Sequence, residues 1–251
     1  MPYHRLKSQC GYSLIELIIV VMIIGLIAGI AVRSLRSSNE VSRTNATLAR
    51  MDLLASAIAG NPDRVSGGVR SDYGYVGDIG SLPPTLDALV TDPGGLATWR
   101  GPYVTDKFGN GGPDYTFRQD AWGVPFQYSG GASIVSTGSG TTLTRHIAAS
   151  VEDLLYNSVT LAITDVERVP PGSTYRDSIR AVLVYPDGAG SYRWRSATPD
   201  AGGRLEFDSI PAGLHRLHII YLPDSDTITR LVNVDPGRTF YTDITLTRGL
   251  H

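Results

Sequence analysis

An uninterrupted apolar run near the N-terminus limits what this chain can fold into more than any other feature. It extends from Tyr12 to Val32, and Glu16 is its only charged residue. As an α-helix of 21 residues it would be about 31 Å long at roughly 1.5 Å per residue, close to the bilayer core of about 30 Å. The run is longer than the apolar part of a secretory signal peptide, and no A-x-A cleavage site follows it. We therefore predict one membrane-spanning helix.

The composition of the whole chain excludes some classes of protein. Its 22 Lys and Arg nearly balance its 24 Asp and Glu, whereas a general nucleic-acid binder carries a basic excess, so we expect no nucleic-acid partner. The 28 Gly and 15 Pro indicate many turns, and therefore short strands. Cys10 is the only cysteine, so the fold has no internal disulfide and depends on packing.

Glu16 needs an explanation because a carboxylate at a helix centre costs about 2.5–3.5 kcal/mol on membrane-insertion scales. One interpretation is an interfacial Glu that reaches the lipid headgroups. The other requires a partner cation: if the chain is cut after Gly11, Tyr12 acquires a free ammonium that a neighbouring subunit could pair with Glu16. Removing either member of such a pair would leave the other charge unmatched in an apolar setting.

The segment Gly11-Tyr12-Ser13-Leu14-Ile15-Glu16 resembles the processing site of type IV prepilins, which combines a short basic leader, a Gly, an apolar block and a Glu at a fixed offset. The resemblance implies that prepilin peptidase cuts after Gly11 and that Tyr12, where the family usually has Phe, becomes the N-methylated terminus. It assigns Glu16 to assembly. It also implies a single pass through the bacterial inner membrane, with the leader cytoplasmic and the globular part periplasmic, followed by assembly into a pilus or pseudopilus.

Two glycines in the apolar run, Gly25 and Gly29, form a small-xxx-small pair that permits close helix packing. The alternative is that Gly is simply common in membrane helices. Beyond Arg33 the sequence turns polar but stays compatible with a helix to about Ala59, before Gly60-Asn61-Pro62 ends it. An amphipathic stripe predicts that this part packs on a sheet; it comprises Val41, Leu48, Met51, Leu54, Ala55 and Ile58.

Residues 61–147 resemble the globular part of the major pseudopilin of type II secretion. The resemblance rests on Gly101-Pro102-Tyr103 and on residues 120–128, which follow a D-x-W-G-x-P-[YF]-x-Y pattern. We expect a small antiparallel sheet in which Phe126 and Tyr128 share one strand face, and we expect Trp122 to bury area against the helix.

Those pseudopilins often bind calcium in a loop after the last hairpin. The corresponding residues 136–142 contain no acidic side chain, so we expect no cofactor there. A second oxygen-rich set surrounds a Gly-rich loop, and for it we favour a solvated turn over a calcium site; the set is Asp106, Asn110, Asp114 and Asp120.

Beyond a Gly/Ser/Thr stretch at residues 138–144 the apolar residues alternate, and turn signals recur at short intervals. This pattern predicts a β-sandwich. Residues 203–217 resemble the carboxypeptidase-regulatory, transthyretin-like β-domain, with Leu205 and Leu214 in place of the usual aromatics. Such modules bind or scaffold, and the resemblance supplies no catalytic set. His215 and His218 are three apart, which on a strand puts them on opposite faces.

We therefore predict an α+β protein: a leader at 1–11, a spine helix at 12–60 packed on a small antiparallel sheet, a pseudopilin-like domain at 61–147 and an all-β sandwich at 148–251. No G-x-S-x-G, H-E-x-x-H or P-loop motif occurs, so we expect no enzyme.

The predicted function is that of a structural subunit of a periplasmic pseudopilus or type IV pilus, acting in type II secretion. Its partners would be prepilin peptidase, other pilin or pseudopilin subunits, the inner membrane and an assembly platform. The alternative is a minor pilin that displays the C-terminal sandwich as a binding or adhesion module. Tyr192 and Trp194 are candidates for such binding, unless they merely belong to an edge strand.

Overall fold

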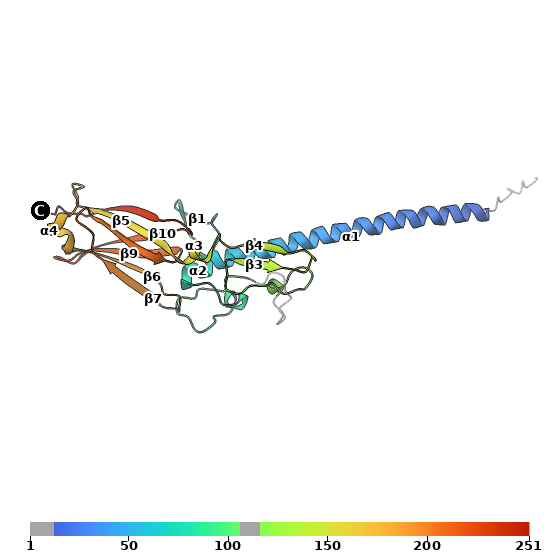
Figure 1. Cartoon of the computed structure of the whole chain (residues 1–251), viewed down its shortest axis with the longest axis horizontal. Helices are drawn as coiled ribbons and strands as arrows, with labels where there is room; N and C mark the ends of the chain where they lie inside the picture. The colour runs from blue at the N-terminus through green and yellow to red at the C-terminus, as the bar shows by residue number, and fades with distance from the viewer. Residues whose placement is uncertain (1–12, 106–115, 251) are drawn as a thin grey trace, which may run out of the picture. The chain divides into compact units, whose positions relative to one another are not determined.

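The computed structural model describes residues 13–105 and 116–250 (Figure 1). The chain forms two compact units, Met1–Asn45 and Ala46–His251. The predicted class, α+β with one long N-terminal helix followed by mostly antiparallel sheets, is confirmed.

The first unit consists, in its described part, of helix α1 (Leu14–Ala59), which continues into the second unit. Its first turn is closed by the Ser13 carbonyl, which accepts hydrogen bonds from the backbone N–H groups of Glu16 at 3.0 Å and Leu17 at 3.2 Å. The large apolar side chains from Leu14 to Val32 are 49–78% exposed. The helix is long and apolar enough to cross a membrane, and the other described residues leave this apolar surface uncovered.

The second unit begins where α1 starts to bury side chains, at Thr47. Met51, Leu54 and Ile58 are fully buried, as their helical spacing predicts. Two positions of the expected stripe are different, because Val41 is 58% and Leu48 38% exposed. The apolar stripe of α1 extends further toward the N-terminus than the core against which the helix packs.

Short elements follow α1 along the chain, and several of them contribute to this first core. They are β1 (Val65–Ser66), β2 (Val69–Arg70), α2 (Gly74–Ile79), η1 (Leu86–Leu89), η2 (Thr116–Arg118), β3 (Ser133–Ser136) and β4 (Leu143–His146). β3 and β4 pair antiparallel. Phe126 is buried and Tyr128 packs partly buried against the same core. The strand expected at these residues is not formed, because Pro125 and Gln127 make only isolated bridges. Trp122 is only half-buried; Phe117, rather than Trp122, provides a fully buried aromatic ring.

Gly60 ends α1 with a φ of +79°, in the left-handed region. A Cβ at this position would lie 2.2 Å from the Asp72 carbonyl oxygen. Glycine is required at this position for two reasons: the left-handed backbone at the helix end, and the close contact of the backbone of residues 72–73.

Helix α3 (Val151–Leu155) leads from the first core into the sandwich. Ser150 caps it: the Ser150 hydroxyl accepts from the Asp153 N–H, and the Asp153 carboxylate accepts from the Ser150 N–H, both at 3.1 Å. Leu154 packs into the first core, although it follows the predicted boundary at 147.

The sandwich has two sheets. Its strands are β5 (Asn157–Thr164), β6 (Ile179–Pro186), β7 (Tyr192–Ala197), β8 (Arg204–Ile210), β9 (Gly213–Tyr221), β10 (Asp226–Val234) and β11 (Phe240–Thr245). One sheet is antiparallel with the order β10-β9-β6-β7. The other has the order β11-β5-β8, and β11 runs parallel to β5. The short helices α4 (Gly172–Tyr175) and η3 (Arg176–Ser178) precede β6.

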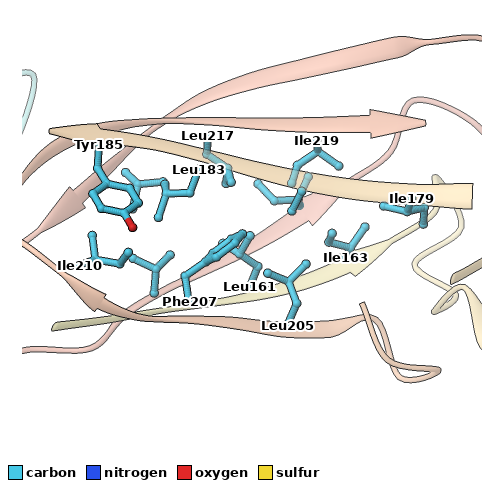
Figure 2. Packing of buried hydrophobic residues seen from close by; sticks show 14 of the residues in the cluster. Leu161, Ile163, Ile179, Leu183, Tyr185, Leu205, Phe207, Ile210, Leu217 and Ile219 are labelled. Atoms are coloured by element: carbon cyan, nitrogen blue, oxygen red, sulfur yellow. The ribbon is translucent and has the colours of Figure 1, made fainter. Parts of the chain in front are cut away.

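The inner faces of the two sheets form a second core. Figure 2 shows Leu183 and Leu217 of one sheet pointing toward Leu161 and Phe207 of the other. In β6, β8 and β9 these residues alternate with exposed or half-buried neighbours, as the period of two predicts. In β5 the alternation is broken at Thr160, which is buried between Val159 and Leu161. The two cores are separate clusters of buried side chains.

Strand β7 is an edge strand of the four-stranded sheet. Arg195 lies on its inner side, and its guanidinium donates a hydrogen bond to the Asp208 carbonyl at the neighbouring edge of the other sheet. A charged side chain on the inner side of an edge strand discourages pairing with another chain.

Polar contacts join the two cores within the second unit. The Gly188 N–H donates to the Ile79 carbonyl, and the Ala212 N–H to the Leu154 carbonyl, both at 2.8 Å. The Tyr73 hydroxyl donates to the side chains of Asn233 and Asp235.

Candidate functional site

Glu16 lies in the first turn of α1 and is exposed. A carboxylate in this position interacts favourably with the helix dipole. No lysine or arginine of the described residues lies within ion-pairing distance of it. Gly11 and Tyr12 lie outside the described residues. Glu16 is therefore a charge on an apolar helix for which the described part of the chain supplies no cation.

Gly25 and Gly29 lie one turn apart on α1. A Cβ built at either position meets nothing within 4 Å, so neither glycine is needed for packing inside this chain. The pair leaves a shallow strip of bare backbone, at which another helix could approach closely.

Asp120 is buried and fully engaged. One carboxylate oxygen accepts from the backbone N–H groups of Trp122 and Val124, each at 2.9 Å. The other accepts from the Ser136 hydroxyl at 2.7 Å and the Gly138 N–H at 3.0 Å. Burial would raise the pKa of this carboxyl, but the four hydrogen bonds outweigh it and hold the pKa below its usual value. Asp120 thus ties the turn at 120–124 to the loop after β3.

This arrangement bears on the oxygen-rich set that contains Asp120. Asp106, Asn110 and Asp114 lie outside the described residues. Among the described residues no group of three or more His, Cys, Asp or Glu could hold a metal ion. The Asp120 oxygens serve protein donors, which favours a structural role for this residue.

A groove lies within the second unit, between the outer face of the four-stranded sheet and the segments 71–78 and 100–103. We call it the aromatic groove; its volume is about 690 Å³. Its lining includes Tyr73, Asp78, Arg100, Tyr103, Tyr192 and Trp194. The sequence predicted Tyr192 and Trp194 as exposed aromatics and did not identify the residues opposite them.

A polar cluster forms one wall of the aromatic groove. The Tyr103 hydroxyl donates to Asp78 at 2.9 Å and accepts from the Arg100 N–H at 3.1 Å. The Arg100 guanidinium lies 3.9 Å from the Asp78 carboxylate and donates to the Tyr192 hydroxyl at 3.3 Å. Burial raises the pKa of Asp78, although Tyr103 and Arg100 oppose the shift. A carboxyl with a perturbed pKa in a groove is a candidate for function.

His215 and His218 lie on opposite faces of β9, as predicted. His215 is buried and its Nε2 lies 2.6 Å from the Pro211 carbonyl oxygen, whereas His218 is half-buried and contacts Thr229. The two imidazoles cannot share a metal ion.

Comparison with known proteins finds a motif model and a curated relative that match part of the chain. Residues 6–32 match the prokaryotic N-terminal methylation motif. The type II secretion system core protein G of Xanthomonas campestris pathovar campestris is 29% identical over 121 residues, which cover 48% of this chain and 68% of that protein.

Solved structures add no argument. A candidate carbohydrate-binding protein from Pseudomonas aeruginosa covers 37% of this chain and 90% of its own, with 18% identity and a TM-score of 0.24. A dioxygenase domain from Streptomyces sp. SirexAA-E covers 38% and 81%, with 13% identity and a TM-score of 0.26. At such scores nothing about this fold or its ligands follows.

The methylation motif and the long apolar helix that it overlaps are features that this chain shares with pilin-like proteins. Together with the similarity to a core protein of type II secretion, the motif supports a relationship to the pseudopilin family. Neither match confirms the carboxypeptidase-regulatory resemblance of residues 203–217.

Proposed function

We propose that this chain is a structural subunit of a periplasmic pseudopilus that serves type II protein secretion. One observation carries the proposal: the methylation motif includes the apolar start of a helix, and the side chains of this apolar part are left uncovered by the described residues. Lipid covers this surface before assembly, and the helices of neighbouring subunits cover it afterwards. The relative, a core protein of a type II secretion system, supports secretion as the process.

The proposed mechanism starts in the inner membrane, with the leader in the cytoplasm and the globular part in the periplasm. Prepilin peptidase cuts after Gly11, and the new N-terminus at Tyr12 is methylated but keeps its positive charge. Glu16 then pairs with the N-terminal ammonium of a neighbouring subunit. Its exposure and its lack of a lysine or arginine partner in the described chain support this role, since an unmatched charge in an apolar setting is costly.

Gly25 and Gly29 would provide the packing surface for the neighbouring helix. Their open surroundings support this part of the proposal. Small residues let helix backbones approach closely, so dispersion contacts replace the lipid that is displaced.

Processing is tested by mass spectrometry of the protein from cells with a prepilin peptidase. We expect a mature chain that begins with N-methylated Tyr12. An intact Met1 end in such cells would contradict the processing step.

The pairing step is tested with Glu16→Ala in the same cells. We expect normal cleavage after Gly11 but loss of the subunit from filaments, measured by cross-linking of sheared pseudopili. Glu40→Ala, which removes a carboxylate from the same helix beyond its apolar part, is the matched control and should assemble. Normal assembly of Glu16→Ala would refute the pairing.

The alternative function is a minor pilin that displays the C-terminal sandwich as a binding module. The second core and the solvent-facing aromatics of β7 favour it. Deleting the gene separates the two: loss of protein release into the medium supports a secretion pseudopilus, whereas intact release with loss of surface adhesion supports a displayed module.

A further inference from the structure

The aromatic groove carries an inference beyond assembly. Its floor is the outer face of the four-stranded sheet. A cross-strand row on this face runs Trp194–Val184–Arg216–Leu231, each residue opposite the next. Outer faces of antiparallel sheets are normally polar, but Trp194 is 72% and Leu231 64% exposed here. This end of the sheet thus presents apolar and aromatic surface to the groove.

Trp194 and Tyr192 form a platform on β7. They are two residues apart on the strand, so their side chains stand on one face, about 7 Å apart along it. The Trp194 indole N–H makes no hydrogen bond to any described residue, and the Tyr192 hydroxyl accepts its bond from Arg100. Both ring faces are therefore available for stacking.

Asp78, Arg100 and Tyr103 stand opposite this platform, in the polar cluster described above. One Asp78 oxygen accepts from Tyr103 at 2.9 Å, and the other has Arg100 only at 3.9 Å. The second oxygen is thus an acceptor with spare capacity in a half-buried place. The Arg216 guanidinium, on the floor, forms no ion pair or hydrogen bond within the described residues and offers free donors.

The charges of the lining restrict the class of ligand. Asp72 and Asp78 balance Arg100 and Arg216, so the groove selects neither an anion nor a cation. An apolar peptide would bury the Asp78 and Arg100 charges without partners, which is costly. A ligand that fits must offer many hydroxyl groups to carboxylate and guanidinium, and an apolar C–H face to the aromatic rings. A neutral sugar ring has both.

The size of the groove agrees with such a ligand. Its volume of about 690 Å³ lies within the range of roughly 300–1,000 Å³ that is usual for small-molecule sites. We propose that the aromatic groove binds a neutral oligosaccharide, with Trp194 and Tyr192 stacking on sugar rings and Asp78, Arg100 and Arg216 contacting hydroxyl groups. The site does not depend on the filament role, because the groove lies wholly within the second unit.

The experiment measures binding of four neutral probes to the full-length chain: cellohexaose, maltohexaose, xylohexaose and chitohexaose. The protein is held in a zwitterionic detergent, since detergents with sugar headgroups would compete. Isothermal titration gives the Kd. We expect at least one probe to bind, and Trp194→Ala to weaken it by about tenfold or more. Asp78→Asn should weaken it as well.

Tyr241→Ala is the matched control, because Tyr241 is an exposed aromatic on β11 of the other sheet. It should leave the Kd unchanged. Trp194→Phe provides a second readout: the shift in tryptophan emission on binding should be lost while an aromatic face, and most of the affinity, remains.

Three results would overturn the proposal. They are absence of binding by all four probes at millimolar concentration, binding that Trp194→Ala leaves intact, and binding restricted to charged polysaccharides such as heparin. Because binding is measured on the unassembled chain, none of these results bears on whether the subunit enters a pseudopilus. Failure of assembly would likewise leave the groove untouched.

Discussion

Acidification should destabilise the sandwich through His215. Burial lowers the pKa of this imidazole from 6.5 to about 4, against the opposing effect of the Pro211 carbonyl. The imidazole lies edge-on to Tyr185, with ring centroids 6.2 Å apart. In the folded chain it therefore stays neutral over a pH range in which the unfolded chain is already protonated.

The sign and size follow from linkage. As the pH falls below about 6.5, His215 becomes protonated in the unfolded state but stays neutral in the folded state. The free energy of unfolding therefore falls by up to about 1.4 kcal/mol per pH unit. The loss ends near pH 4, where the folded state also takes up the proton. Over the whole window the loss is about 3 kcal/mol, a large part of the roughly 5–15 kcal/mol that stabilises a typical domain.

The assay is urea unfolding of the full chain in detergent, between pH 7 and 5, followed by near-ultraviolet circular dichroism. This signal comes from aromatic packing, and α1 from Leu14 to Ala59 contains no aromatic residue, so the membrane helix does not contribute. His215→Gln should remove most of the loss of stability. His218→Gln, three residues along on the other face, should retain it. Equal pH dependence in His215→Gln and the wild type would refute the reasoning.

Four further outcomes are expected. Asp120→Ala strands four hydrogen-bond donors and should cost about 3–4 kcal/mol of unfolding free energy in urea titrations; a change below about 1 kcal/mol would contradict its structural role. Because the pKa of Asp120 is lowered, the stability that it contributes is present near neutral pH and is lost as the pH falls below about 4. Asp120→Asn, which does not titrate, should abolish this pH dependence. Gly60→Ala should cost about 2 kcal/mol or more in the same assay, because it adds strain and a clash with Asp72. Gly25→Leu with Gly29→Leu should leave this unfolding unchanged but reduce cross-linking between subunits; undiminished cross-linking would exclude the glycines from the interface.

Much of this fold could be predicted from local pattern. The apolar run predicts the membrane-spanning part of α1. The period of two in residues 159–163 predicts the contribution of β5 to the sandwich core, because alternate side chains of a strand point to the same face. The end of α1 at Gly60 follows from turn chemistry. These features depend only on residues that are close in the sequence, so they can be predicted from the sequence alone.

Other features depend on contacts between distant residues. Leu48 continues the stripe of α1 but stays exposed, since no element of the described chain covers it. In the sequence Asp120 looks like an exposed acidic residue of a loop, but in the structure it is buried and accepts hydrogen bonds from Ser136 and Gly138. Asp78 and Arg100 face Tyr192 only because the sandwich lies beside α2. No spacing rule reports such pairings, so the polar wall of the groove could not be found from the sequence.

The parallel pairing of β11 with β5 has a consequence for how the chain folds. About 80 residues separate the paired positions Val159 and Phe240. β11, the parallel partner of β5, is therefore the last strand of the sandwich in chain order. Contacts so distant in sequence form slowly, and until they form one edge of β5 stays open to pairing with other chains. If the globular part crosses the membrane before folding, the sandwich cannot close until β11 has crossed. Export and folding would then be ordered in time by the strand order of a single sheet.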